Sequence, residues 1–187
     1  MTRTRAIGFA LTALAALAAL ALPAVLVAGQ SDADTAKAIG TPASADEPQR
    51  VTIPSIGVDS PLLRLARDQA PPPEKGMTAG WYTASAMPGR PGAAVITGHE
   101  AADGRAVFRD LRKLAAGDTI EVKRGDGKLL RFTVTATETV GRAAAFPTGK
   151  VFGTTGERAL RLVTCTGDRD ARGHPVRNLI VYATLRA

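Results

Sequence analysis

The chain has 187 residues and a formal net charge of +7, with 24 Lys and Arg against 17 Asp and Glu. This length favours one domain with accessory segments. Aromatic residues make up only 4% of the chain and the arginines are scattered, so no platform for stacking nucleic acid bases is visible. The charge is interpreted as a solvated basic surface, and no nucleic acid partner is expected.

The N-terminal segment is dominated by Ala and Leu. Residues 6–30 carry no charge, and two arginines precede them while two aspartates follow. A membrane helix needs about 20 predominantly apolar residues, and positive charges mark the cytoplasmic side. Residues 1–28 are therefore predicted to form a single-pass signal anchor in the cell membrane, with the rest of the chain on the extracellular face. A signal peptide cleaved near Ala28 is the alternative.

Residues 29–49 contain almost no large apolar side chains and are rich in Ala, Ser, Asp, Gly and Pro. Such a segment cannot bury enough apolar surface to offset the entropy of ordering, so a flexible tether is expected. The folded domain is predicted to span residues 50–187, which is long enough for one well-buried core.

The predicted domain is mostly β-strand. Residues 50–63 are rich in β-branched side chains interrupted by Pro54 and Gly57, which predicts edge strands with bends. The apolar run at 92–98 is bounded by glycines and predicts a short buried strand.

Further along, a Gly-Asp-Gly turn separates two stretches in which apolar and polar residues alternate. This pattern predicts a hairpin over residues 118–140, with the alternation of a half-buried sheet. Two more strands are expected at 159–165 and 177–186, and only residues 106–114 have a helical pattern of apolar side chains. Short strands at this spacing favour a barrel or a sandwich.

Cys165 is the only cysteine, and it ends the apolar run at 159–165. In an exported chain, a single cysteine indicates either pairing between molecules or a reactive thiol. The alternative is a small buried side chain with a purely structural role. The same choice applies to His99, which follows a short apolar strand and is one of two histidines. His174 lies in a loop next to glycine and proline and is interpreted as exposed and incidental.

Cys165 and His99 both close strands, and strand ends on one rim of a sheet can meet in space. A thiolate that attacks a carbonyl, an imidazolium that protonates the departing amine and a fixed cation are sufficient for thiol-based acyl transfer. Arg177 immediately precedes a predicted strand, whereas Arg172 lies in the preceding loop, so Arg177 is the preferred cation. The spacing of the cysteine and histidines is not that of a zinc site, and neither metal nor cofactor is expected.

The sequence blocks resemble those of the sortase family, and within it the class F sortases of actinobacteria. The resemblance covers about residues 50–185. The blocks that carry it are "VTIPSIGVDSPL", "GWY", "PGRPGAAVITGH", "VFRDLRKLAAGDTIEV", "AFPTGKVFG", "LRLVTC" and "RNLIVYA". The family's Thr-Leu-x-Thr-Cys pattern is kept except at its first position, where Arg161 stands.

The resemblance implies a mainly β fold, an eight-stranded sortase-like barrel with one or two short helices. It also implies a cysteine transpeptidase in which Cys165 is the nucleophile, His99 the general acid and base, and Arg177 the group that stabilises the substrate carbonyl. Thr97 and Thr164 are candidate substrate-binding residues.

In such an enzyme the substrates are exported proteins with an LPxTG-like sorting signal near the C-terminus. The acyl group passes through a thioester to an amine of a peptidoglycan precursor.

Two other readings stay open on the residues alone. One is a non-catalytic envelope-binding β domain with a buried structural cysteine. The other is a different cysteine acyltransferase, such as an L,D-transpeptidase or a papain-like hydrolase. The order of His99 and Cys165 in the chain disfavours the second reading.

Overall fold

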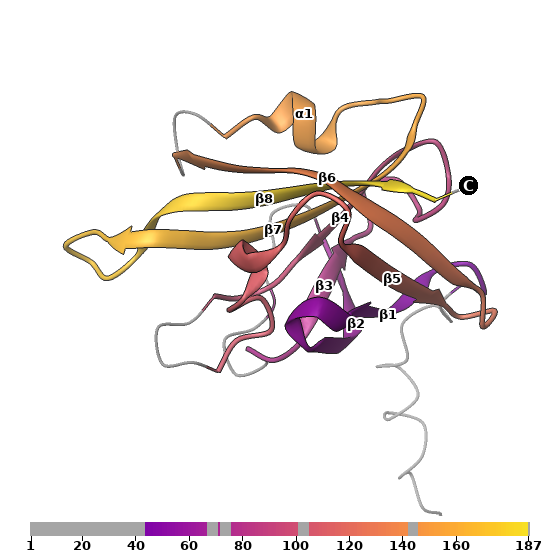
Figure 1. The fold of residues 1–187 in the computed structure, drawn as a ribbon, viewed down its shortest axis with the longest axis horizontal. Coiled ribbons are helices and arrows are strands. Elements are labelled where there is room, and N and C mark those ends of the chain that lie inside the picture. Colours follow the sequence, from indigo (N-terminus) through magenta and orange to yellow (C-terminus); the bar gives the residue numbers. More distant parts are fainter. Residues whose placement is uncertain (1–43, 67–70, 72–75, 101–104, 142–145, 187) are drawn as a thin grey trace, which may run out of the picture. The chain divides into compact units, whose positions relative to one another are not determined.

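The computed structural model describes residues 44–66, 71, 76–100, 105–141 and 146–186 (Figure 1). The predicted membrane anchor at 1–28 lies outside the described residues, as does most of the predicted tether. Among the described residues, no helix combines the length and apolar character that a membrane crossing requires.

Eight strands in the described part of the chain close into a barrel in the order β1-β2-β3-β4-β7-β8-β6-β5 (Figure 1). Their bounds are β1 (Pro48–Ile53), β2 (Val58–Leu65), β3 (Ala79–Tyr82), β4 (Gly92–Thr97), β5 (Thr119–Arg124), β6 (Leu129–Gly141), β7 (Arg158–Arg169) and β8 (Pro175–Leu185). The β2–β3 and β4–β7 pairs are parallel, and the remaining neighbours are antiparallel. The mainly β, eight-stranded barrel that the resemblance implied is confirmed.

Strand β1 already begins at Pro48, because the residues before Arg50 are held to the barrel. The Gly125 amide donates to the carbonyl oxygen of Glu47 at 3.0 Å. The Glu47 carboxylate accepts hydrogen bonds from Arg64 on β2. A largely buried carboxylate needs such a partner, since an unpaired charge away from water is costly.

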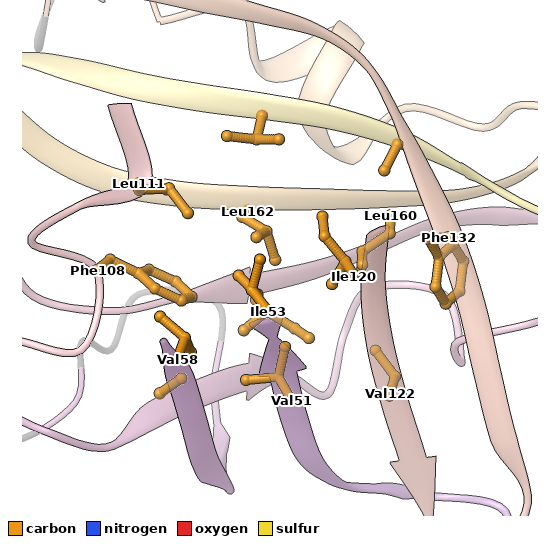
Figure 2. Close-up of a cluster of buried hydrophobic side chains, with 14 of the residues drawn as sticks. Val51, Ile53, Val58, Phe108, Leu111, Ile120, Val122, Phe132, Leu160 and Leu162 are labelled. Atoms are coloured by element: carbon orange, nitrogen blue, oxygen red, sulfur yellow. The ribbon is translucent and has the colours of Figure 1, made fainter. Parts of the chain in front are cut away.

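The barrel interior is filled by side chains that alternate along the strands with solvent-facing ones. Ile120 and Val122 on β5 are fully buried, as is Phe132 on β6. Figure 2 shows these side chains converging with those of β1 and β7. The predicted hairpin of β5 and β6 is confirmed, and Gly127 occupies its turn with φ of +81°.

Residues 106–114 do not form the expected helix. They make successive turns and one 3₁₀ turn, η4 (Leu111–Lys113). The apolar pattern is nevertheless correct, since Val107, Phe108, Leu111 and Leu114 all join the interior core. The Phe108 amide donates to the carbonyl oxygen of His99 at 3.0 Å, so the segment is positioned by bonds to distant residues.

The short helix α1 (Thr148–Phe152) lies in the connection between β6 and β7, on the outer side of the barrel (Figure 1). Its Val151 is buried with three residues of the strands beneath it, Val95, Val163 and Ile180. Strands β7 and β8 are thus covered on both faces, which explains why the sequence reads as nearly continuous apolar runs there.

Candidate functional site

Cys165 lies in β7 with its residue partly exposed. The strand register pairs it with Asn178 on β8, and pairs Val163 with Ile180. Directly opposed residues point to the same face of an antiparallel pair, and residues two apart share a face. The thiol is therefore on the outer face, the one on which Val163 and Ile180 pack against α1, and not in the barrel core. Its partial exposure disfavours the reading as a buried structural cysteine.

The parallel pairing of β4 and β7 brings His99 toward Cys165. The last ladder pair is Thr97 with Val163. The Gly98 amide donates to the Val163 carbonyl oxygen at 3.2 Å, one step further along. His99 follows Thr97 by two residues, as Cys165 follows Val163, so the two residues stand at matched positions just after the last ladder pair.

The residue before His99 has to be a glycine, because a larger side chain does not fit at position 98. A Cβ atom built on Gly98 would lie 2.6 Å from Phe108 Cδ2 and 2.6 Å from Val107 Cγ1. The backbone before His99 thus packs directly against Val107 and Phe108, whose side chains belong to the barrel core. The glycine in the "ITGHE" block is a requirement of packing, since its φ is not in the left-handed region.

The imidazole of His99 has a defined partner. Its Nε2 lies 2.6 Å from the carbonyl oxygen of Pro71. A carbonyl oxygen only accepts hydrogen bonds, so Nε2 carries a hydrogen in this arrangement. Nδ1 is then the ring nitrogen left without this bond.

Arg177 pairs with Thr166, one step beyond the Cys165 pair. Alternation along the strands directs the Arg177 side chain to the opposite face of the β7–β8 pair from Cys165. Its Cβ, Cγ and Cδ lie against Gly167, each 3.4 Å from a Cβ built there. Arg177 is thus one pair away from Cys165 in the ladder, but its side chain starts from the other face.

The turn that joins β7 and β8 is closed by its own hydrogen bonds. Asp170 Oδ1 accepts from the backbone amides of Arg172 and His174, both at 2.9 Å. Arg169 Nη1 donates to the Gly173 carbonyl oxygen at 2.6 Å. Arg172 is thus further along the hairpin from Cys165 than Arg177. His174 is exposed, as the sequence indicated.

Thr97 and Thr164 both use their hydroxyls to join β4 to β7. Thr97 Oγ1 donates to the Val163 carbonyl oxygen at 3.0 Å. Thr164 Oγ1 donates to the Gly98 carbonyl oxygen at 2.8 Å, and Thr164 is only 2% exposed. Both hydroxyls are engaged inside the protein, and substrate binding by these residues stays a prediction.

Sequence reasoning did not find a polar cluster that joins α1 to the strands, here named the Arg161 cluster: Arg161, Tyr182, Glu138 and Lys150. The Arg161 guanidinium carbon lies 4.7 Å from the centre of the Tyr182 ring. The Tyr182 hydroxyl donates to Glu138 Oε2 at 2.8 Å. Lys150 Nζ lies 3.8 Å from Glu138 Oε1, and the Lys150 carbonyl accepts from Arg161 Nε at 3.5 Å. The cluster ties α1 to strands β6, β7 and β8.

The surroundings of the cluster shift the pKa values of two of its residues, Tyr182 and Arg161. Burial raises the pKa of Tyr182 to about 12, and the hydrogen bond to Glu138 adds to the increase. Burial also lowers the pKa of Arg161. The departure of Arg161 from the family's Thr was the sequence signal that could have pointed to this cluster, but its partners lie far away in the chain.

No group of three or more potential metal-binding His, Cys, Asp or Glu side chains occurs among the described residues. The candidate site consists of the Cys165 thiol on β7, the His99 imidazole just after β4 and the polar groups near them. This arrangement can carry out nucleophilic attack on a carbonyl carbon and transfer of a proton to the departing group.

Known structures share this barrel. Sortase C-1 from Actinomyces oris matches with a TM-score of 0.61 and 24% identity, over 74% of this chain and 73% of that one. Sortase A from Corynebacterium diphtheriae matches with a TM-score of 0.59 and 23% identity, over 74% and 60% of the two chains. A sortase D5 transpeptidase from Clostridium perfringens matches with a TM-score of 0.58 and 24% identity, over 74% and 78%.

A search of curated protein sequences finds no significant match. The model of the sortase domain family, in contrast, matches residues 51–186. Because this match covers most of the chain, the protein belongs to the sortase family, whose members are cysteine transpeptidases.

Proposed function

We propose that this sortase is a membrane-anchored transpeptidase of the class F type. It cleaves an LPxTG-like sorting signal near the C-terminus of exported proteins and joins the acyl fragment to an amine of a peptidoglycan precursor. The observation that carries the proposal is the register of β4 and β7, which brings the ends of the two strands with His99 and Cys165 together.

In the first half of the reaction, Cys165 Sγ attacks the carbonyl carbon of the Thr–Gly bond. The S–C bond forms, and the C–N bond then breaks. His99 in its protonated form gives the Nδ1 proton to the departing amine, while Nε2 stays bound to Pro71. The product of this half is a thioester on Cys165.

In the second half, an amine attacks the thioester carbon. The new C–N bond forms and the C–S bond breaks, and the amine's proton passes to His99. The thiolate of Cys165 is restored together with the imidazolium. Water can take the place of the amine, which gives slow hydrolysis instead of transfer.

Arg177 supplies the fixed cation in this proposal. A guanidinium remains charged at all relevant pH values and offers a rigid fork of N–H donors to carbonyl oxygens. Its position next to Gly167, one pair from Cys165 in the ladder, supports this role over Arg172 in the hairpin turn. Substrate contacts of Thr97 and Thr164 are part of the same proposal.

Anchoring through residues 1–28, with the barrel on the extracellular face, fits the location of the substrates. The uncharged N-terminal stretch and the charges around it support this part of the proposal. The partners are therefore exported proteins with a sorting signal and a peptidoglycan precursor amine, and neither a cofactor nor a metal enters the reaction.

The test uses the full chain in detergent with a library of Leu-Pro-x-Thr-Gly-like peptides and a glycine amine. Mass spectrometry is expected to detect joined products and a thioester on Cys165. The Cys165→Ala variant should form neither. Transpeptidation that survives in Cys165→Ala would refute the assignment of the nucleophile.

A further inference from the structure

Asn178 on β8 lies directly opposite Cys165 and is only 8% exposed. On its other side, β6 places Val140 opposite it. A mostly buried residue that carries a carboxamide therefore lies on the outer face, between an aliphatic side chain and the thiol.

This carboxamide carries two N–H donors and an acceptor oxygen. Polar groups with this degree of burial are almost always hydrogen-bonded. Among the described residues, no hydrogen bond joins the Asn178 carboxamide to another group, and its nitrogen and oxygen are not among the side-chain atoms that are both sealed from water and unpartnered. A donor that reaches solvent, lacks a partner among the described residues and lies beside a nucleophile is available to an atom of the substrate.

Asn178 differs from the neighbouring polar residues of β7 and β8 in the face to which its side chain points. Arg177 and Thr166 point to the opposite face, and Arg177 is exposed. Thr164, on the other side of Cys165, also points away and is bonded to Gly98. Of the polar side chains on these two strands, Asn178 is the one directly opposite the thiol and on the same face.

We propose that Nδ2 of Asn178 donates a hydrogen bond to the carbonyl oxygen of the acyl group that Cys165 attacks. When the S–C bond forms, the π electrons of the carbonyl move onto this oxygen, and Asn178 stabilises the negative charge. When the electrons return, the C–N bond breaks and the departing nitrogen takes its proton from His99. Only the identity of the acyl group rests on the function proposed above.

The reach of the side chain supports this role. Directly opposed residues in an antiparallel pair have Cβ atoms about 4.5–5.5 Å apart. The oxyanion is bonded to the carbon that Sγ attacks, so it lies within the range of a carboxamide on the facing residue. A donor of this kind contributes most when it is already in place and shielded from water.

Two small electrophiles separate this role from general effects on the thiol. Acylation of Cys165 by p-nitrophenyl acetate forms an oxyanion, whereas alkylation by iodoacetamide does not. In the full chain in detergent, Asn178→Leu keeps the approximate size of the side chain and removes the donor. This variant should slow acylation by about 10²-fold and leave the alkylation rate unchanged.

Asn178→Ala should show the same selective loss as Asn178→Leu. The matched control is Val176→Ala, an exposed residue on the same strand, which should change neither rate. With a sorting-signal peptide, the Asn178→Leu defect should be in kcat and not in KM, because the bond strengthens in the transition state.

Three results would overturn the inference. They are an unchanged acylation rate in Asn178→Leu, equal losses of acylation and alkylation, and a wild-type chain that the ester does not acylate. If no peptide is joined to an amine but the selective loss appears with the ester, the proposed substrate class fails and the role of Asn178 stands.

Discussion

The hydroxyl of Thr164 donates a 2.8 Å hydrogen bond to the carbonyl oxygen of Gly98. This bond joins the residue before Cys165 to the residue before His99, across two strands that are 66 positions apart in sequence. The relative position of the two proposed catalytic side chains therefore depends on a buried contact between their immediate neighbours.

Replacing Thr164 with Val keeps the shape of the side chain and removes this bond. The buried Gly98 carbonyl then loses a partner, which is expected to lower the free energy of unfolding by about 1–3 kcal/mol. Misplacement of reacting groups by about 1 Å costs about 10²-fold in rate, so kcat/KM should fall by 10- to 100-fold. Thr164→Ser retains the hydroxyl and should retain most of the activity. Urea unfolding and peptide transfer assays measure the two effects, and full activity in Thr164→Val would contradict the coupling.

Gly98→Ala should impair the site by crowding. The new methyl group would lie 2.6 Å from Phe108 Cδ2, and neither Phe108 nor the strand end has free space. Overpacking of this kind is expected to cost about 1–3 kcal/mol of stability and to displace His99. Gly156→Ala is the control, because a Cβ there meets no atom within 4 Å. Thermal unfolding and transfer rates should distinguish the two variants; similar behaviour would show that the contact with Phe108 is unimportant.

The transfer reaction should show a bell-shaped dependence of kcat/KM on pH. The reactive form holds Cys165 as thiolate and His99 as imidazolium. Raising the pH removes the imidazolium, and lowering it removes the thiolate. Initial rates with one peptide, measured from about pH 5 to about pH 10, test this dependence. A flat profile across neutral pH is the result that this pairing does not allow.

Arg161→Met should loosen α1 from the strands beneath it. Methionine keeps an unbranched apolar stem but loses the contact with the Tyr182 ring and the donors to the carbonyls of Leu160 and Lys150. The expected loss of stability is about 1–2 kcal/mol, from a partly buried cation–π contact and hydrogen bonds. Because α1 covers the outer face that carries Cys165, KM for the peptide should also rise.

The matched control for Arg161→Met is Arg158→Met, an exposed position on the same strand. It should leave both the free energy of unfolding and KM close to the wild-type values. If the two variants behave alike in chemical unfolding and in peptide transfer, the Arg161 cluster does not hold α1.

Tyr182 should ionise later in the folded protein than in the unfolded chain. Its pKa is raised from 10.0 to about 12, first by burial and then by the bond to Glu138. A pKa raised on folding means that Tyr182 stabilises the fold fully below pH 10, and that this contribution is lost as the pH rises toward about 12. The near-ultraviolet absorption of tyrosinate, compared between wild type and Tyr182→Phe in folded and urea-unfolded protein, measures the shift. Equal ionisation in the two states would contradict it.

The sequence by itself determined the mainly β class of fold and indicated two candidate catalytic side chains. Alternation of apolar and polar residues marked the β5–β6 hairpin, because side chains on a strand point to opposite faces at every step. Cys165 stood out because it is the only thiol, and His99 because it follows an apolar strand and a glycine. These signals are local, or depend on residue type, so they can be read without knowing which segments meet.

The tertiary structure alone decided which side chains share a face with the thiol. The pairing of Cys165 with Asn178 depends on the register of the β7–β8 hairpin. This register shifts between Thr166 and Arg169, closer to the turn than the Cys165 pair. A change of one residue in that register would exchange Asn178 for Arg177 on the outer face. The same is true of residues 106–114, whose apolar side chains enter the barrel through turns instead of a helix. In both places the outcome rests on contacts between distant segments, and local sequence preference is too weak to specify those contacts.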